Sequence, residues 1–424
     1  MLSMITDPFL HSLVVTFVND VWPKAFDLVI LFGVASLPFL FTPIAFRNWV
    51  AYVKAKWING QKKVLLEIKL PQETFKSPAA MELALNIFHD PFGDPSRKNR
   101  YMEGKVPTWA SLEIACVNGE IRFFIWAFES KKSLIQAHLY AQFPDIAIFE
   151  VEDYAREVLY DPTKHDIFCG EFFKAKPNPY PIKTYVDYGL SKDPDEELKI
   201  DPMAPLIEGL GTLATTDRAY IQFGIKAHRK EKSFWLNKDM DDPFKDEQKT
   251  EMDKVIKEMM IDDKTPNALK MTAARKDLMD AISKYEDKYV FDVVIRAIYL
   301  AEKDKFNKGN SAVLTGAFKQ FGSTTRLNSF KPELLAFKYW FQDIGGKKVA
   351  QWKKDVFECY VKRSFFHAPW TAKLHVFKYK KLKPSILNSE ELATIYHFPG
   401  SVVKTPALKR IPSKRAQAPS NLPV

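Results

Sequence analysis

The stretch SLEIACVNGEIRFFIWAF, residues 111–128, contains two runs of strand-forming residues separated by Asn118 and Gly119. An Asn-Gly pair accepts the positive φ angles of a two-residue turn, and between alternating apolar runs it is the strongest short-range signal for a β-hairpin. The sequence therefore predicts antiparallel strands at 111–117 and 120–128, joined by this turn.

The segments that flank this hairpin complete a recurrent pattern. Residues 64–70 and 146–151 have the alternation of strands, while 77–89 and 130–143 have helical spacing, the first with a Ser-Pro start. The resulting order, β-α-β-β-α-β, is typical of a ferredoxin-like unit. We therefore predict a first ferredoxin-like domain over residues 64–160.

The same order recurs further along the chain, which predicts a second α+β domain over residues 181–384. A charge-rich insert at about 235–287 lies between its two long strands, and Asp242-Pro243 and Thr265-Pro266 predict the starts of two helices there. We interpret this insert as a solvated helical hairpin, with a partner-docking arm as the alternative. The runs with strand-like or helix-like patterns are 181–188, 202–213, 219–228, 289–300 and 311–321.

Residues 26–46 (FDLVILFGVASLPFLFTPIAF) are apolar apart from Asp27. About 20 such residues are needed to cross a bilayer, and transmembrane helices tolerate proline. A cleaved signal peptide is disfavoured, because no basic region precedes the run and no small-residue cleavage site follows it. A transmembrane helix is the preferred interpretation, with a buried core helix as the alternative. Residues 1–25, which contain a shorter and more polar apolar run, are predicted to be an interfacial segment.

The formal charge of +10 is concentrated in two short segments. Residues 47–63 and residues 401–424 each contain five basic residues and no acidic one, so the part between them is nearly neutral. The basic juxtamembrane segment 47–63 predicts a single-pass protein of the cell membrane, with its N-terminus outside and its C-terminal body in the cytoplasm. The residues predicted to anchor and orient the helix are Trp22, Arg47, Trp49, Lys54, Lys56, Trp57, Lys62 and Lys63.

The sequence lacks the common motifs that mark a nucleotide, metal or nucleophile site. There is no phosphate-binding loop, since Gly345-Gly346-Lys347 lacks the leading glycine and the hydroxyl residue. No pair of histidines has the spacing of a zinc helix, and the three cysteines are isolated. We predict no catalytic residue, no cofactor and no metal, and hence a protein that is not an enzyme.

Residues 385–424 combine a short helical pattern with a basic tail that contains several prolines. In LNSEELATIYHFPG (387–400), Asn388 and Glu391 have the spacing of a capping box, and Pro399-Gly400 ends the helix. We predict that this segment docks a partner, with a flexible tail as the alternative. The predicted docking residues are Leu392, Ile395, Tyr396, His397, Phe398, Pro399, Lys409, Arg410, Lys414 and Arg415.

The sequence of residues 387–400, followed by RIPSKRAQAPSNLP (410–423), resembles the segment just ahead of the motor domain in membrane-anchored ATPases of type IV secretion and conjugation systems. The runs at 76–89, 111–128 and 180–202 resemble the same uncharacterised N-terminal region. In those relatives a Walker A domain follows, whereas this sequence ends at Val424. The resemblance therefore implies the platform without the motor.

These observations lead to one main hypothesis and two alternatives. The main one is a non-enzymatic, membrane-anchored component of a type IV secretion or DNA-transfer apparatus that docks a separate ATPase or neighbouring subunits. It implies an oligomeric assembly and an indirect relation to DNA. The first alternative is a nucleic-acid-binding module that uses the basic tail and an aromatic sheet face, although the nearly neutral body argues against it. The second is a membrane-bound enzyme with an unfamiliar site.

Overall fold

The structure is a computed structural model of the 424-residue chain, which divides into two compact units, residues 1–58 with 95–105 and residues 59–94 with 106–424. The residues that the structure describes are 8–72, 76–90, 96–158, 160–191, 200–230, 242–262, 265–266, 273–323, 326–333, 343–366, 383–400, 403 and 405–411.

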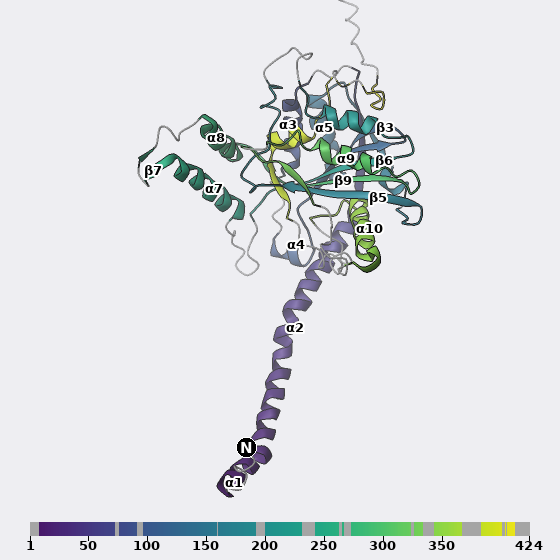
Figure 1. Cartoon of the computed structure of the whole chain (residues 1–424). Coiled ribbons are helices and arrows are strands. Elements are labelled where there is room, and N and C mark those ends of the chain that lie inside the picture. The colour runs from purple at the N-terminus through teal and green to yellow at the C-terminus, as the bar shows by residue number, and fades with distance from the viewer. Residues whose placement is uncertain are drawn as a thin grey trace, which may run out of the picture. The chain divides into compact units, whose positions relative to one another are not determined.

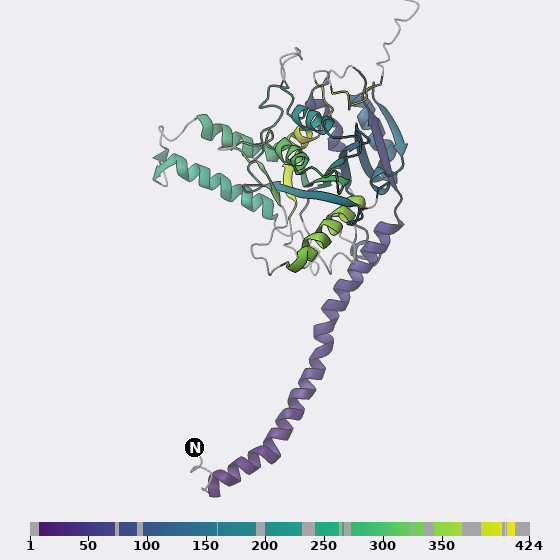
Figure 2. The same ribbon diagram turned by 45° about the vertical axis from the view of Figure 1, so that its right-hand side comes forward.

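The first unit is dominated by one long helix (Figures 1 and 2). Helix α1 (Pro8–Thr16) continues through a π-helical turn (Phe17–Val21) into α2 (Trp22–Gly60), which has 39 residues and includes both internal prolines. Among the described side chains of its most apolar stretch none is buried, and by length and composition α2 could cross a membrane. This finding agrees with the predicted apolar N-terminal helix. Pro8, the first described residue, begins α1.

The last turns of α2 are held by the short helix α4 (Arg97–Tyr101) and the loop after it. The indole N–H of Trp49 donates to the carbonyl oxygen of Tyr101 at 3.1 Å. Gly104 has a φ of +71°, and a Cβ atom there would lie 2.2 Å from the carbonyl oxygen of Val53. Glycine is therefore required at this position by both its backbone angle and the close approach of the loop to α2.

The second unit contains an antiparallel sheet that runs, in spatial order, β10-β5-β9-β6-β2-β3-β1-β4, with β11 also paired to β9. Asn118 and Gly119 have φ angles of +55° and +76° at the β2–β3 turn, so the predicted hairpin is confirmed. The strands are β1 (Lys63–Lys69), β2 (Ala110–Val117), β3 (Glu120–Phe128), β4 (Ala147–Val151), β5 (His165–Lys174), β6 (Arg218–Ala227), β9 (Val290–Glu302), β10 (Phe330–Glu333) and β11 (Ser385–Asn388).

The strand order has an internal correspondence. The sheet consists of two halves, β4-β1-β3-β2 and β10-β5-β9-β6, each given from its outer edge inward. When the strands of each half are numbered along the chain, both halves have the spatial order fourth, first, third, second. The two sets join where β2 pairs with β6, so that both halves belong to one sheet. The predicted α+β class with an antiparallel sheet is confirmed.

The two faces of this sheet are covered by different helices. One face carries the main hydrophobic core, to which α3 (Pro78–Leu85), α5 (Lys132–Gln142), α6 (Ala204–Gly211), α9 (Lys308–Ala317) and α12 (Ser389–Ile395) contribute. The other face is contacted by α10 (Lys347–Val361), which packs against β5 and the 3₁₀ turn Tyr154–Arg156. Further 3₁₀ turns are Asn86–Phe88, Glu129–Lys131 and Ile344–Gly346.

The predicted helical insert forms an arm of two helices that lie side by side (Figures 1 and 2). Helix α7 (Pro243–Met259) begins at the predicted Asp242-Pro243 signal, and the Asp242 carboxylate accepts from the N–H of Phe244 at 3.1 Å. The second predicted start is wrong. Thr265-Pro266 forms strand β8, which pairs with β7 (Met260–Asp262), and helix α8 begins only at Ala273 and ends at Asp287.

The strand predicted at 181–188 is wrong, because this segment consists of loop and turns. The carboxylate of Asp187 accepts from the N–H of Thr184 at 2.8 Å, which closes a local turn. The N–H of Ile182 donates to Glu391 and that of Tyr185 to Thr394, at 2.8 and 2.9 Å. The backbone donors that a strand would have used are therefore bound by side chains of α12.

The first strand of the second half is β5, at residues 165–174, instead of the predicted strand at 181–188. It lies between the two predicted domain ranges, 64–160 and 181–384, and pairs with β9 over eight residue positions, His165 to Phe172. Charged residues at both ends and Gly170 conceal its alternation in the sequence. The first strand of the second half therefore begins earlier than predicted.

Candidate functional site

A row of polar side chains crosses four neighbouring strands on the face covered by α10. Glu113 on β2, Gln222 on β6, Arg296 on β9 and Glu171 on β5 are successive cross-strand partners. The amide nitrogen of Gln222 donates to Glu113 at 3.0 Å, and its oxygen accepts from Arg296 at 2.9 Å. Arg296 also forms an ion pair with Glu171 at 2.8 Å. All four side chains are buried, so the row is continuous and shielded from water.

Arg363 completes this row from the end of α10. Its guanidinium donates to both carboxylate oxygens of Glu113, each at 3.0 Å, and also to Asp153. The residue has a φ of +47°, the left-handed conformation in which helices commonly end. The side chains of Arg363 and Glu113 are 1% and 0% exposed. The register of α10 over the sheet is thus fixed by a two-pronged buried ion pair.

Two tyrosines extend the network beneath α10. The hydroxyl of Tyr154 donates to Glu113 at 2.8 Å and lies 2.6 Å from the hydroxyl of Tyr360. Burial, followed by the nearby Glu113 carboxylate, raises the pKa of both phenols well above their ordinary value. Both tyrosines therefore stay neutral hydrogen-bond donors at physiological pH.

A second buried network joins the C-terminal segment to the base of the arm. Glu391 forms an ion pair with Lys174 at 2.8 Å and accepts from the hydroxyl of Tyr285 on α8. The same carboxylate accepts from the N–H of Asn388 at 2.9 Å, and Asn388 caps Glu391 in return, which confirms the predicted capping box. Burial lowers the pKa of Lys174, while Glu391 opposes that change.

The neighbouring Glu390 ties the same two elements together. Its carboxylate lies 3.2 Å from Lys284 on α8 and 2.8 Å from Lys288, and it accepts from the hydroxyl of Thr184. Burial alone would raise the pKa of Glu390, but Lys288 and Thr184 hold it below the ordinary value. Helix α12 is therefore fastened to the arm by two adjacent buried carboxylates.

A third cluster lies where α7 begins. His228, just after β6, places Nδ1 2.6 Å from Asp292 on β9 and Nε2 3.3 Å from Asp242. Burial would lower the pKa of His228, but the two carboxylates raise it above the ordinary value. This histidine is the polar link between the sheet and the first residue of the arm.

These three networks were missed by sequence reasoning, although part of the signal was present. Glu113, Glu171 and Arg296 are charged residues inside otherwise apolar strand patterns, which indicates buried pairing. Their partners lie tens to hundreds of residues away, so the pattern alone does not name them. Every ionisable group in the Glu113 row is engaged by another protein group, which gives the row a positioning role rather than an open reactive centre.

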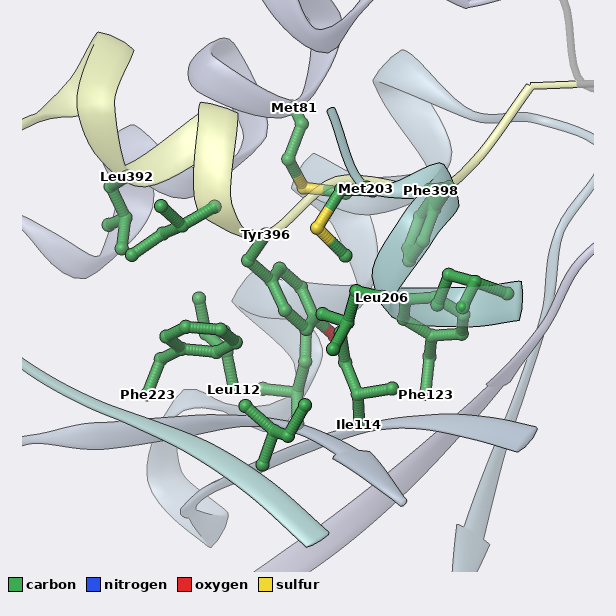
Figure 3. Packing of buried hydrophobic residues seen from close by; sticks show 14 of the residues in the cluster. Met81, Leu112, Ile114, Phe123, Met203, Leu206, Phe223, Leu392, Tyr396 and Phe398 are labelled. Atoms are coloured by element: carbon green, nitrogen blue, oxygen red, sulfur yellow. The ribbon is translucent and has the colours of Figure 1, made fainter. Parts of the chain in front are cut away.

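The six predicted docking residues of 392–399 are buried in the core, which corrects the prediction. Tyr396 points from the end of α12 toward Leu112, Ile114 and Phe223 on the sheet (Figure 3). Its hydroxyl donates to the carbonyl oxygen of Phe124 at 3.2 Å. A partner has no access to these side chains in the folded body. The buried residues are Leu392, Ile395, Tyr396, His397, Phe398 and Pro399.

The basic residues that follow have different surroundings. Arg410 donates to the carbonyl oxygen of Gly400 at 2.7 Å, and Ile411 bridges to Pro71 beyond β1, so the chain is fastened to the body as far as 411. Lys409 is exposed and forms an ion pair with Glu120. Lys414 and Arg415 lie outside the described residues.

The predicted anchor residues lie on and after α2. Trp22, Arg47 and Lys56 are exposed, whereas Trp49 donates the hydrogen bond to Tyr101. The side chains of Lys54 and Trp57 are partly buried on the last turns of α2. In the second unit, Lys62 lies 3.9 Å from Glu129, and burial lowers the pKa of Lys63, with a smaller effect from Arg156.

The large aromatic side chains of the central strands are buried. Phe123, Phe223 and Tyr299 belong to the core, while Phe149 on the edge strand β4 is 49% exposed. An open aromatic sheet face of the kind that stacks nucleic-acid bases is therefore not offered by these central strands.

The three cysteines are free, and Cys359 is only partly buried. Cys116 and Cys169 are buried, and burial raises the pKa of their thiols to about 11 and about 12. Among the described residues, no group of three or more His, Cys, Asp or Glu side chains is arranged to hold a metal ion. Comparison of the chain with known protein families and with curated proteins gave no match to either.

Proposed function

We propose that this chain is a non-enzymatic, membrane-anchored platform of a type IV secretion or DNA-transfer apparatus. Helix α2 holds an α+β body at the cytoplasmic face of the cell membrane, where the body docks a separate ATPase or neighbouring subunits. The observation that carries this proposal is the exposed apolar length of α2 in the same chain as a body in which buried ion pairs such as Arg363–Glu113 and Lys174–Glu391 fix its own elements.

The support for the membrane anchor is physical and does not rest on the resemblance to a known family. Apolar side chains such as Phe32 and Phe39 are 66% and 81% exposed, a cost in water that a bilayer removes. The five basic residues of 47–63 follow the apolar run directly, and this bias supports the orientation with the body in the cytoplasm.

The body's architecture supports a more specific fold assignment within this proposal. We interpret its two halves as tandem ferredoxin-like units, because each has the β-α-β-β-α-β order and the matching strand arrangement. Their joining at β2 and β6 would make one rigid plate, which suits a scaffold. The resemblance of 387–423 to the segment ahead of secretion motors supports the choice of apparatus.

The docking surface is proposed to lie in the residues that remain accessible after the burial of 392–399. They include the exposed Lys409 and the charged surface of the α7–α8 arm, and we add Lys414 and Arg415 of the basic tail, which lie outside the described residues. Deleting residues 385–424 would remove β11 and α12 from the core, so it cannot test docking. The tail must instead be tested by substitution.

The test uses the full chain in membranes, co-expressed with the P-loop ATPase of the same secretion locus. We expect the triple variant Lys409→Ala, Lys414→Ala and Arg415→Ala to capture at least about tenfold less ATPase, since complementary charges govern encounter. Lys303, Lys305 and Lys308 are three exposed lysines on the body, and their triple alanine variant is the matched control. Equal capture by wild type and both variants would reject the tail as the docking site, and a chain recovered entirely in the soluble fraction would reject the platform itself.

A further inference from the structure

The hydrogen bonds of His228 require more protons than a neutral imidazole has. Nδ1 faces a carboxylate oxygen of Asp292 at 2.6 Å, and Nε2 faces one of Asp242 at 3.3 Å. Ionised carboxylates only accept hydrogen bonds, and a neutral imidazole has one N–H and one bare nitrogen. Both contacts are therefore hydrogen bonds only when the ring carries both protons.

We propose that His228 is a pH-sensitive clasp that fastens the start of helix α7 to the sheet when protonated and releases it when neutral. The position of the α7–α8 arm would then respond to pH in the range where imidazoles titrate. This inference concerns the fold itself and does not depend on the partner or apparatus proposed above.

The charged groups around the ring support this behaviour. On the sheet side, Asp292 also forms an ion pair with Lys226 at 3.0 Å, so it keeps a partner whatever the state of His228. Among the described residues, His89 and Arg229 also lie nearby, and burial, followed by Arg229 and to a smaller extent His228, lowers the pKa of His89. On the arm side, Asp242 faces His228 directly. The net effect of these surroundings is a raised pKa for His228.

The loss of one proton has an unequal effect on the two carboxylates. The shorter contact to Asp292 is the one that keeps the remaining N–H, and Nε2 then presents a lone pair to the carboxylate of Asp242. That contact becomes repulsive, while Asp242 retains its local cap on Phe244. The link between α7 and the sheet through this residue is thereby lost.

The two helices of the arm differ in how they are otherwise held. Helix α8 is secured by Tyr285 on Glu391 and by Lys284 on Glu390, and its chain leads on to β9 two residues after the helix ends. Near its start, helix α7 relies on Phe244 in a small cluster with Tyr285 and on the hydrogen bond from Gln248 to the carbonyl oxygen of Ile282, while Tyr180 of the body binds Glu251 further along the helix. Release of the clasp should therefore loosen the start of α7 and leave α8 in place.

The direction of the pH effect follows from the raised pKa. The stabilisation that the clasp gives is fully present below the ordinary pKa of histidine and is lost as the pH rises through the higher pKa of the folded state. A mildly acidic solution should hold the arm, and a mildly alkaline one should free it.

Hydrogen–deuterium exchange of the full chain in detergent tests this inference at about pH 5.5 and about pH 8.5, which bracket imidazole titration. After correction for the intrinsic rates, we expect protection of 243–259 to fall by about tenfold at the higher pH, as for loss of one charged hydrogen bond. Protection of 273–287 should change much less. Equal protection of 243–259 at the two pH values would overturn the proposal.

Two variants separate the clasp from general effects of pH. In Asp242→Asn, the amide can donate to the bare nitrogen of a neutral His228 and can still cap α7, so α7 should stay protected at both pH values. In His228→Gln, protection should no longer depend on pH. A wild-type pH dependence in either variant would contradict the clasp.

His138, an exposed histidine on α5, supplies the matched control. His138→Gln should keep the full wild-type pH dependence of α7, because the ring lies on a different helix and takes no part in the cluster. Loss of the dependence in this variant would show that titration elsewhere moves the arm, which would also overturn the proposal.

Discussion

Leu112, Ile114 and Phe223 point from the sheet into the core under α12 (Figure 3). Glu113 and Gln222, their neighbours on the same strands, instead form hydrogen bonds on the other face, beneath α10. One face is held by non-directional burial and the other by paired charges with fixed partners. A slip of one residue in β2 would place Glu113 in the apolar core and Leu112 in the charge row. The two faces together therefore specify a single register more strictly than either would alone.

This difference also decides how each face should respond to substitution. Apolar packing loses the transfer and cavity energy of the atoms removed, and neighbouring side chains partly relax. A paired charge behaves otherwise, because removing one partner leaves the other buried without compensation. The charged face should therefore lose more stability than the apolar face when one partner of a pair is substituted. It should lose less when both partners are replaced together.

The largest effect is expected for Arg363→Ala. The change leaves Glu113 and Asp153 without the guanidinium that faces them, and we expect the free energy of unfolding to fall by about 3–5 kcal/mol. Chemical denaturation of the full chain in detergent, followed by tryptophan fluorescence, measures this. Trp109, whose indole donates to the carbonyl oxygen of Arg363 at 2.9 Å, reports locally.

The control is the double variant Arg363→Met with Glu113→Leu, which replaces the pair by apolar groups. It should be destabilised by clearly less than Arg363→Ala, because no charge is left buried alone. If the double variant is at least as unstable as Arg363→Ala, the loss in Arg363→Ala does not come from an unpaired buried charge. The ion pair would then stabilise this face by more than apolar side chains in its place.

The next effect tests the apolar face. Leu392→Ala removes a fully buried side chain of α12, and we expect a loss of about 2–4 kcal/mol in unfolding free energy from transfer and cavity terms. Leu83→Ala on the adjacent α3 is the control, because Leu83 is 55% exposed and should cost about 0.5 kcal/mol or less. Similar losses in the two variants would argue that 387–400 is not part of the core.

Local signals allowed much of this face to be predicted from the sequence. Asn118-Gly119 fixed the β2–β3 hairpin, and Asn388 with Glu391 marked the start of α12, because both signals act within four residues. The apolar side of α12 was also visible as Leu392, Ile395 and Tyr396. What the pattern did not indicate is that this side faces the chain's own sheet rather than a partner.

The polar networks could not be predicted, for a physical reason. Glu391 is buried because Lys174 lies beside it, more than 200 residues earlier in the chain, and Glu113 because Arg363 lies above it, 250 residues later. The loop at 181–188 was misassigned for the same reason, since its alternation is real but α12 binds its backbone donors. Pairing at such distances depends on the fold and leaves no local pattern.

A smaller loss of stability is expected for the N-cap of α12, where a polar hydrogen bond holds a helix that packs on the apolar face. Asn388→Ala removes the oxygen that accepts from the N–H of Glu391 at 2.8 Å, and we expect a loss of about 1–2 kcal/mol because the cap is buried. Asn307→Ala removes an exposed cap on α9 and should cost about 0.5–1 kcal/mol. Thermal unfolding of both variants under one set of conditions gives the comparison, and a larger loss for Asn307→Ala would contradict it.

The smallest effect concerns an ion pair that is not buried. The side chain of Lys409 is 73% exposed where it pairs with Glu120, so water screens the ion pair. Lys409→Ala should therefore change the unfolding free energy by about 0–1 kcal/mol, which is less than the loss expected for Arg363→Ala. Denaturation with and without added salt checks this, since salt should abolish any difference. A loss above about 2 kcal/mol would mean that the tail helps to hold the body together. If the loss is small, a fall in ATPase capture by variants of Lys409 reports docking rather than unfolding, because the side chain is then dispensable for the fold.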